Sequence, residues 1–237
     1  MKIEVNDLYN FVKKASMSGD IDTMYVDVTT TGLHCRIQNE SNVCFTDTKL
    51  SINTDDDSLG RLFIKNTKRF LKALKTFTGE ITLSKEGVNV LKIVGSDNKR
   101  TADIILASEK IVENIVDRDM PNIPATRTFT TNKDFLSKIL VDLELSNSTE
   151  IKIQANKKQV NFVIGTKNES DMYSNSIDVE DGEDVKVSIG EYLTSVYNSV
   201  EKNSDLVFKI GTNMPITIIE KTDNIEFTCL IAPIVQK

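Results

Sequence analysis

Residues 64–83 read IKNTKRFLKALKTFTGEITL, a stretch in which a helical pattern runs into a strand pattern. At about 100° per residue, the apolar side chains of residues 64–77 fall on one arc of a helix. This arc holds Ile64, Thr67, Phe70, Leu71, Leu74 and Phe77. The opposite arc holds Lys65, Lys68, Arg69, Lys72 and Lys75, with no acid among them. The pattern predicts an amphipathic helix that packs on a core and presents a basic face to solvent.

The basic face carries a cost that a solvated helix usually avoids. Like charges at positions i and i+4 destabilise a helix by roughly 0.2–0.5 kcal/mol per pair, and Lys68 and Lys72 form such a pair. Lys65 with Arg69 and Lys72 with Lys75 are further like-charged neighbours. A wholly basic face indicates an acidic partner, and phosphate is the obvious one. The alternative is a solvated face in a Lys-rich sequence.

Working outward from this helix, both halves of the chain repeat one order of elements: helix, strands, helix, strands. In the first half the expected segments are 6–17, 23–28, 33–37, 43–52, 64–77, 80–84, 88–94 and 101–107. In the second half they are 132–145, 150–154, 159–164, 174–179, 189–200, 205–210, 216–220 and 226–231. The sequence therefore predicts an α+β fold of two similar domains, each with two helices packed on antiparallel sheet.

A proline-containing connector separates the halves. Pro121 and Pro124 keep this stretch out of a helix or a central strand. We therefore expect an N-terminal domain over residues 1–118, an inter-domain connector over 119–128 and a C-terminal domain over 129–237.

The net charge of −6 is distributed unevenly. Residues 1–118 carry 17 Lys+Arg and 17 Asp+Glu, whereas residues 119–237 carry the remaining 12 and 18. The first helix adds Lys13 and Lys14 on the side expected to face away from its apolar stripe. In the second half, Lys133 and Lys138 share their helix with three acids, Asp134, Asp142 and Glu144. Any surface for an acidic partner should therefore lie mostly in the first domain.

Enzymatic signatures are missing from the sequence. His34 is the only histidine, and no phosphate loop, nucleophile elbow or dinucleotide fingerprint occurs. Asp55, Asp56 and Asp57 form an acidic run of the kind that usually belongs to a solvated loop. Three scattered cysteines indicate a reducing compartment and no zinc site. We expect a protein that is not an enzyme and that needs no cofactor or metal.

Three stretches, residues 32–45, 64–83 and 214–233, together carry a resemblance to a known family. The first resembles a strand, loop and strand, the second a helix and strand, and the third a closing hairpin that ends near Ala232 and Pro233. In this order and spacing they are similar to the DNA polymerase sliding clamps, that is, proliferating cell nuclear antigen and its archaeal and phage relatives. The resemblance covers the whole chain in order and length.

The resemblance implies a ring of three subunits, with the helices lining a hole that encloses duplex DNA without reading its sequence. Lys13, Lys14, Arg69 and Lys72 match basic residues that the family places on this inner surface. The implied partners are duplex DNA, a DNA polymerase, an ATP-driven clamp loader and other proteins with short clamp-binding peptides. The implied location is inside the cell with the replication machinery, and no membrane is involved.

The resemblance also implies a pocket for partner peptides beneath the connector. The matching positions are Gln38, Val43, Phe45, Ile123, Pro215, Leu230, Ala232 and Pro233. Gln38 stands where the family commonly has an apolar residue, so the pocket is expected to be more polar. Val43, Phe45 and Leu230 could instead close the core between the domains.

By the same analogy, subunits would meet through edge strands, one near Ile111 and Ile115 and one near Tyr173 and Ile177 of the neighbouring copy. Pairing such edges removes a risk of aggregation. The ring could be a homotrimer or a heterotrimer. An alternative is a clamp-fold interaction scaffold or checkpoint-type paralogue with little role in processivity. This alternative remains because the helices of the second half carry few cations.

Overall fold

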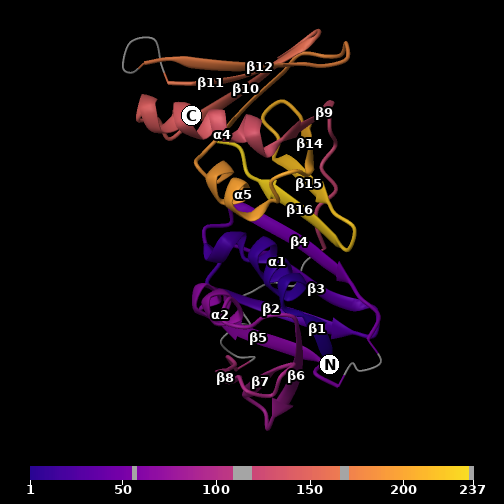
Figure 1. Ribbon diagram of the computed structural model, residues 1–237. Helices are drawn as coiled ribbons and strands as arrows, with labels where there is room; N and C mark the ends of the chain where they lie inside the picture. The colour runs from indigo at the N-terminus through magenta and orange to yellow at the C-terminus, as the bar shows by residue number, and fades with distance from the viewer. Residues whose placement is uncertain (55–57, 109–118, 166–170, 235–237) are drawn as a thin grey trace. The chain divides into compact units, whose positions relative to one another are not determined.

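The computed structural model describes residues 1–54, 58–108, 119–165 and 171–234 (Figure 1). The chain divides into two compact units. The first comprises Met1–Glu40, Phe45–Met120 and Thr222–Phe227, and the second comprises Ser41–Cys44, Pro121–Lys221 and Thr228–Lys237. Both units combine helices with antiparallel sheet. The expected α+β class is confirmed.

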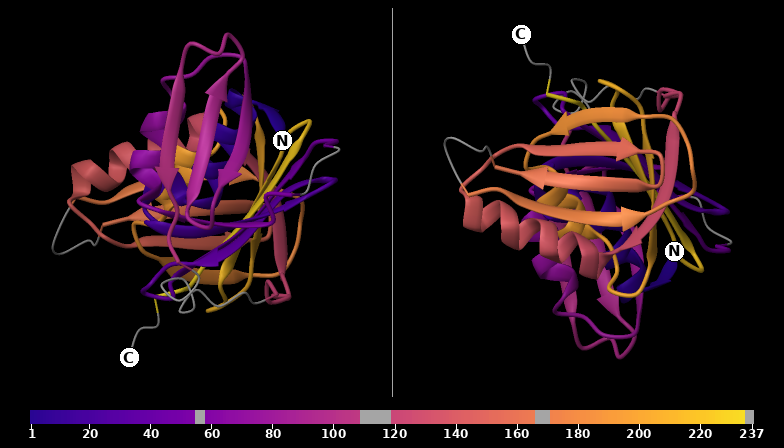
Figure 2. Two further views of the ribbon diagram at one scale, coloured as in Figure 1. Left: turned by 90° about the horizontal axis from the view of Figure 1, so that it is seen from below. Right: turned by 90° about the horizontal axis from the view of Figure 1, so that it is seen from above.

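Within its described residues, the first unit has two sheets and the helices α1 and α2 (Figure 1). One sheet has the order β1-β6-β7-β8, and β5, β2, β3 and β4 are neighbours in that order in the other. The helices α1 and α2 pack on each other. The elements are β1 (Lys2–Glu4), α1 (Val5–Ala15), β2 (Thr23–Thr29), β3 (Gly32–Gln38), β4 (Cys44–Ser51), β5 (Arg61–Lys65), α2 (Thr67–Leu74), β6 (Glu80–Glu86), β7 (Val90–Gly95) and β8 (Thr101–Ile105). Figure 2 (left) shows β6, β7 and β8 side by side.

The second unit repeats this topology strand for strand. The order β12-β11-β10-β13 matches β4-β3-β2-β5, and β9-β14-β15-β16 matches β1-β6-β7-β8. The helix α4 packs against β11 and β12 (Figure 2, right) and also contacts α5. The elements are β9 (Arg127–Asn132), α4 (Lys133–Ser146), β10 (Ile151–Asn156), β11 (Gln159–Ile164), β12 (Tyr173–Asp178), β13 (Val185–Ile189), α5 (Leu193–Ser199), β14 (Asp205–Ile210), β15 (Ile216–Lys221) and β16 (Ile225–Ile231). The internal repeat is therefore one of topology.

Four strands were not expected from the sequence: β1, β5, β9 and β13. They occupy equivalent places in the two units, since each directly precedes a helix. Only their ends overlap expected elements: residues 64–65, 132 and 189 fall in the expected helices and residues 127–128 in the expected connector, whereas residues 2–4 fall in no expected element. For α2 the expected start at residue 64 is wrong, because Ile64 pairs with Met24 of β2 and the helix begins only at Thr67.

Asn66 makes the turn between β5 and α2. Its φ of 57° lies in the left-handed region, which asparagine adopts more readily than most residues. Its side-chain oxygen accepts the Arg69 N–H at 2.9 Å, as an N-cap does. The Thr67 N–H donates to the Asp22 carbonyl at 2.9 Å. The start of α2 is thus fixed by a single residue and two hydrogen bonds.

Two buried polar side chains hold loops of the second unit. Glu220 is 1% exposed and accepts hydrogen bonds from the Glu201 N–H at 2.8 Å and from the Ser204 hydroxyl. Arg127 donates to the carbonyl of Glu180 at 2.7 Å. A Cβ at Gly182 would lie 2.5 Å from an Arg127 nitrogen, so a larger residue there would force the guanidinium to shift.

Candidate nucleic-acid interface

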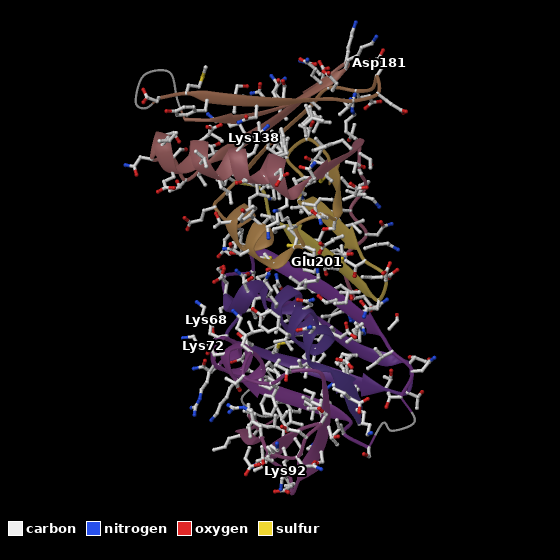
Figure 3. The ribbon with its side chains drawn as sticks, in the orientation of Figure 1. Lys68, Lys72, Lys92, Lys138, Asp181 and Glu201 are labelled. Carbon is white, nitrogen blue, oxygen red and sulfur yellow. The ribbon has the colours of Figure 1, made fainter. Side chains whose placement is uncertain are left out.

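The basic face of α2 and its flanks comprises Lys65, Lys68, Arg69, Lys72 and Lys75, and all five side chains are exposed. The opposite side of the helix buries Thr67, Phe70, Leu71 and Leu74. Figure 3 shows Lys68 and Lys72 extending from α2 away from the strands of the first unit. Lys65 belongs to β5 and Lys75 caps the helix. The strand end and the helix together therefore contribute five exposed cations.

The electrostatics of α2 are unfavourable for the helix by itself. Its first turn contains no acid and carries Lys68 and Arg69, although the positive end of the helix dipole favours negative charge there. Lys68 lies 3.7 Å from Asp20, an ion pair between exposed groups. Within the described residues, Lys65, Arg69 and Lys72 form no ion pair. A bound polyanion would relieve this concentration of positive charge.

The first helix contributes less than expected. Lys13 is half-buried, and Lys14 is only 1% exposed, so the expectation that Lys14 faces away from the apolar stripe is wrong. On a helical wheel Lys14 lies about 60° from Phe11, at the flank of the stripe, and its stem packs with the buried side. Lys75 joins the two helices, with its ammonium 5.4 Å from the centre of the Tyr9 ring.

The corresponding helices of the second unit differ in charge. Lys133 donates to the Val200 carbonyl at 2.9 Å and lies 4.7 Å from the centre of the Tyr197 ring. Its ammonium thus stabilises the C-terminal end of α5, where a cation is favourable. Lys138 is exposed (Figure 3) but shares a surface hollow with Asp134 and Asp142. Lys133 and Lys138 therefore form no counterpart to the basic face of α2.

The expected peptide-pocket residues fall in both units. Gln38 ends β3 opposite Phe45, which is buried in the first unit. In the second unit Leu230 is buried, whereas the other five are half-buried: Val43, Ile123, Pro215, Ala232 and Pro233. The Ala232 N–H donates to the Val43 carbonyl at 2.8 Å. The second unit thus brings two of the expected positions into direct contact.

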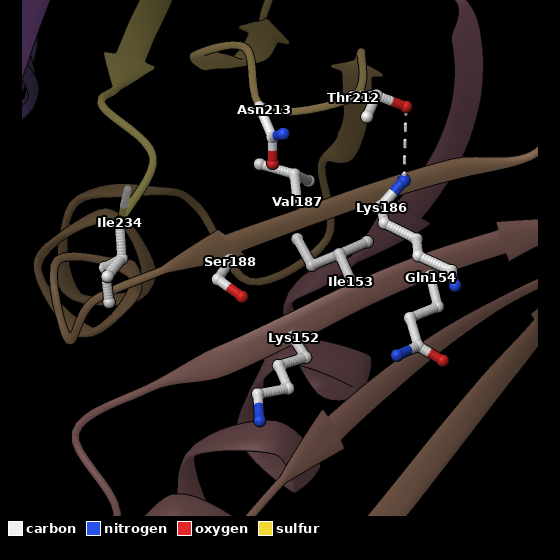
Figure 4. Close-up of a pocket in the computed structure, with 9 residues that line it drawn as sticks. All are labelled: Lys152, Ile153, Gln154, Lys186, Val187, Ser188, Thr212, Asn213 and Ile234. Atoms are coloured by element: carbon white, nitrogen blue, oxygen red, sulfur yellow. Dashed lines mark hydrogen bonds between the residues drawn. The ribbon is translucent and has the colours of Figure 1, made fainter. Parts of the chain in front are cut away.

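A cavity of about 490 Å³ lies in the second unit beside the C-terminal segment (Figure 4). Ile234 lines it, and the Ile234 N–H donates to the Ser188 carbonyl at 2.8 Å. Lys152 of β10 and Lys186 of β13 add positive charge to its wall. None of the eight expected pocket residues lines this cavity. Sequence reasoning missed it because β13 was not recognised as a strand.

The two units also expose edge strands. Tyr173 and Ile177 lie in β12, the last strand of its sheet, where exposed and half-buried residues alternate. Ile111 and Ile115 fall outside the described residues. In the first unit, β8 is one of the described strands that end a sheet, and its Ile105 is 65% exposed. Leu145 of α4 is also 61% exposed. Both units therefore present apolar side chains at or near their edges.

Among the residues that the structure describes, no group of three or more His, Cys, Asp or Glu side chains could hold a metal ion. His34 pairs across the strands with Asp47 at 2.8 Å, an ordinary structural contact. Across the described ranges, no helix is both long and apolar enough to cross a membrane. The acidic run at residues 55–57 lies outside the described residues.

Comparison with solved structures gives full-length matches. The chain is similar to A. fulgidus PCNA, in a structure with the C-terminal region of FEN-1 bound (TM-score 0.80, 14% identity, 100% of this chain and 98% of that chain). It is similar to proliferating cellular nuclear antigen from Entamoeba histolytica (TM-score 0.82, 17% identity, 99% and 98%). It is also similar to PCNA from Thermococcus kodakaraensis (TM-score 0.79, 20% identity, 98% and 98%).

No family model and no curated protein matches the sequence. The structural match therefore rests on the fold, at a sequence identity of 14–20%. From end to end, the chain has the two-domain fold of the PCNA sliding clamps.

Proposed function

We propose that three copies of this chain close into a ring around duplex DNA and tether a DNA polymerase to it. The helices would line the hole, and the basic face of α2 would contact phosphates of either strand. Contacts to phosphates carry no sequence information, which suits a protein that moves along DNA. This proposal rests on the basic face of α2, which is exposed on a clamp fold. Among the described residues, only Lys68 of this face is paired to an acid.

The ring would close through the exposed edges of the two units. The strand β12 would pair with β8 or the chain that follows it in a neighbouring copy, since both strands end their sheets. The exposed side chains of Ile105 and Leu145 support burial at such a contact. A head-to-tail interface of this kind closes into a ring when its rotation permits.

Partner proteins would dock as short peptides near the C-terminal segment of the second unit. One of the similar structures is of a PCNA with the C-terminal region of FEN-1 bound. The contact between Val43 and Ala232, together with the adjoining cavity, gives this chain apolar and polar surface for such a peptide. Loading onto DNA would require a separate ATP-driven clamp loader.

A second candidate function is a clamp-fold interaction scaffold or a member of a heterotrimer. The charge of the second unit favours this function, because Lys133 donates a hydrogen bond to the Val200 carbonyl and Lys138 lies among acids. Such a protein would bind partners through its outer surface and contribute little to processivity.

Light scattering and primer extension together test the proposal. We expect a solution mass near three times 26.5 kDa, and longer products from a cognate polymerase when the chain and its loader are added to a primed circular template. A homotrimer that leaves product length unchanged would favour the scaffold. A strict monomer at high concentration would contradict the homotrimeric ring.

A matched pair of variants tests the interface. Ile177→Asp places a charge on the half-buried side of β12 and should yield monomers, because an unpaired charge is costly to bury. Ser176→Asp places the same charge on the neighbouring exposed position and should leave the trimer intact. Trimers that survive Ile177→Asp at all concentrations would exclude β12 from the interface.

A further inference from the structure

Two buried cysteines lie in contact in the second unit. The Sγ atoms of Cys44 and Cys229 are 3.4 Å apart, and these residues are separated by 185 positions in the chain. Cys44 is 2% exposed and Cys229 is 0% exposed. A disulfide needs an S–S distance of about 2.05 Å, so the sulfur atoms would have to move about 1.3 Å closer. Rotation of the two side chains can supply much of this movement.

The pair lies next to positions of the expected peptide pocket. Cys44 follows Val43 directly, and Cys229 precedes Leu230. Between these segments the Ala232 N–H donates to the Val43 carbonyl. A covalent bond between Cys44 and Cys229 would therefore fasten the C-terminal segment to the chain that begins β4, beside the surface where a partner peptide would bind.

We propose that Cys44 and Cys229 form a reversible disulfide when the protein meets a peroxide. One thiol would reduce hydrogen peroxide, becoming a sulfenic acid and releasing one water molecule. The second thiol would attack the sulfenic sulfur, forming the S–S bond and releasing a second water molecule. The two sulfur atoms lose two electrons in total, and the peroxide gains them.

Burial sets the rate of this reaction. A hydrogen bond with Cys44, followed by burial, raises the pKa of the Cys229 thiol well above its usual value of 9.0. The thiolate is the reactive form, so oxidation should be slow at neutral pH and faster in alkaline solution. Peroxide is small, and Cys44 is the first residue of β4. Opening of this strand end would admit it without global unfolding.

Intact-mass spectrometry of the full chain tests the proposal. After peroxide treatment and alkylation in denaturant, we expect a species with one alkylated cysteine instead of three, and dithiothreitol should restore all three. Peptide mapping should assign the bond to Cys44 and Cys229. The readout does not depend on DNA or peptide binding, so it is independent of the proposed function.

Single variants provide the controls. Cys35→Ala should still form the disulfide, whereas Cys44→Ala and Cys229→Ala should form no intramolecular bond. Circular dichroism of each variant establishes that it is folded before oxidation. The urea-unfolded wild type, treated with the same peroxide, is the positive control for crosslinking. If the unfolded chain forms a disulfide while the folded chain keeps three alkylatable thiols, the proposal is overturned. A bond that includes Cys35 would overturn it equally.

Discussion

Replacement of Lys72 by alanine tests the basic face of α2 most directly. Lys72 is exposed and lies in the last turn of the helix. Alanine has the highest helix propensity, so Lys72→Ala should leave α2 folded. The variant removes one positive charge from each subunit while preserving the apolar side that packs on the core.

The expected magnitude follows from counterion release. Each phosphate neutralised contributes about 0.9 to the slope of log K against log salt concentration for duplex DNA. If all three copies of Lys72 in the ring contact phosphate, the slope should become shallower by about 2.7. Lys68→Ala should have a smaller effect, because Lys68 already lies 3.7 Å from Asp20 and must give up part of that ion pair to reach a phosphate.

Fluorescence anisotropy of a labelled duplex, titrated with protein at several salt concentrations, measures this slope without a loader. Lys138→Ala is the matched control, since Lys138 is an exposed helical lysine that shares a surface hollow with Asp134 and Asp142. The expected order of effect is Lys72, then Lys68, then Lys138. An unchanged slope for Lys72→Ala, or an effect of Lys138→Ala as large, would refute the assignment of DNA contact to α2.

Two further predictions concern stability. Glu220→Ala removes a buried acceptor of two hydrogen bonds, and hydrogen bonds to charged groups are worth about 1.5–3 kcal/mol each. Urea unfolding followed by circular dichroism should therefore show a free energy of unfolding that is lower by about 3–6 kcal/mol. The control Asp205→Ala, which removes an exposed carboxylate, should change this free energy little. Because the pKa of Cys229 is raised in the folded chain, the unfolded chain releases the thiol proton at a lower pH. The contribution of this proton to the free energy of unfolding is therefore complete below the usual pKa of 9.0 and is lost as pH rises through the pKa of the folded chain. The fall in unfolding free energy above that pH should be smaller in Cys229→Ala than in wild type; equal slopes would contradict the linkage.

Much of the fold could be predicted because the hydrophobic pattern follows the pairing. The alternation in residues 205–210 and 216–220, for example, matches β14 and β15, which pair with each other. The strand β5 was missed in part because Ile64 also satisfies the helical period of the residues that follow it, whereas β13 was missed although its apolar residues alternate. Strand pairing with β2 and β10, which is a long-range contact, decides these segments.

The candidate site was predictable where charge alone defines it and not where packing decides. The five cations of the basic face are exposed, as the pattern predicts. The burial of Lys14 and the internal contacts of Lys133 depend on neighbours such as Val200 and Tyr197, which no local pattern identifies. The contact between Cys44 and Cys229 joins segments 185 positions apart and has no local signature at all.

The short turn at Asn66 has a mechanical consequence for α2. With one residue between β5 and α2 and both neighbouring hydrogen bonds made, the backbone beneath the basic face has little freedom to tilt or shift. In the proposed ring, adjustment to a passing phosphate would then fall to the long, flexible side chains of Lys68 and Lys72. A rigid backbone that carries mobile side chains would let one phosphate be released as the next is bound, so that resistance to sliding would stay low while contact with the duplex is kept.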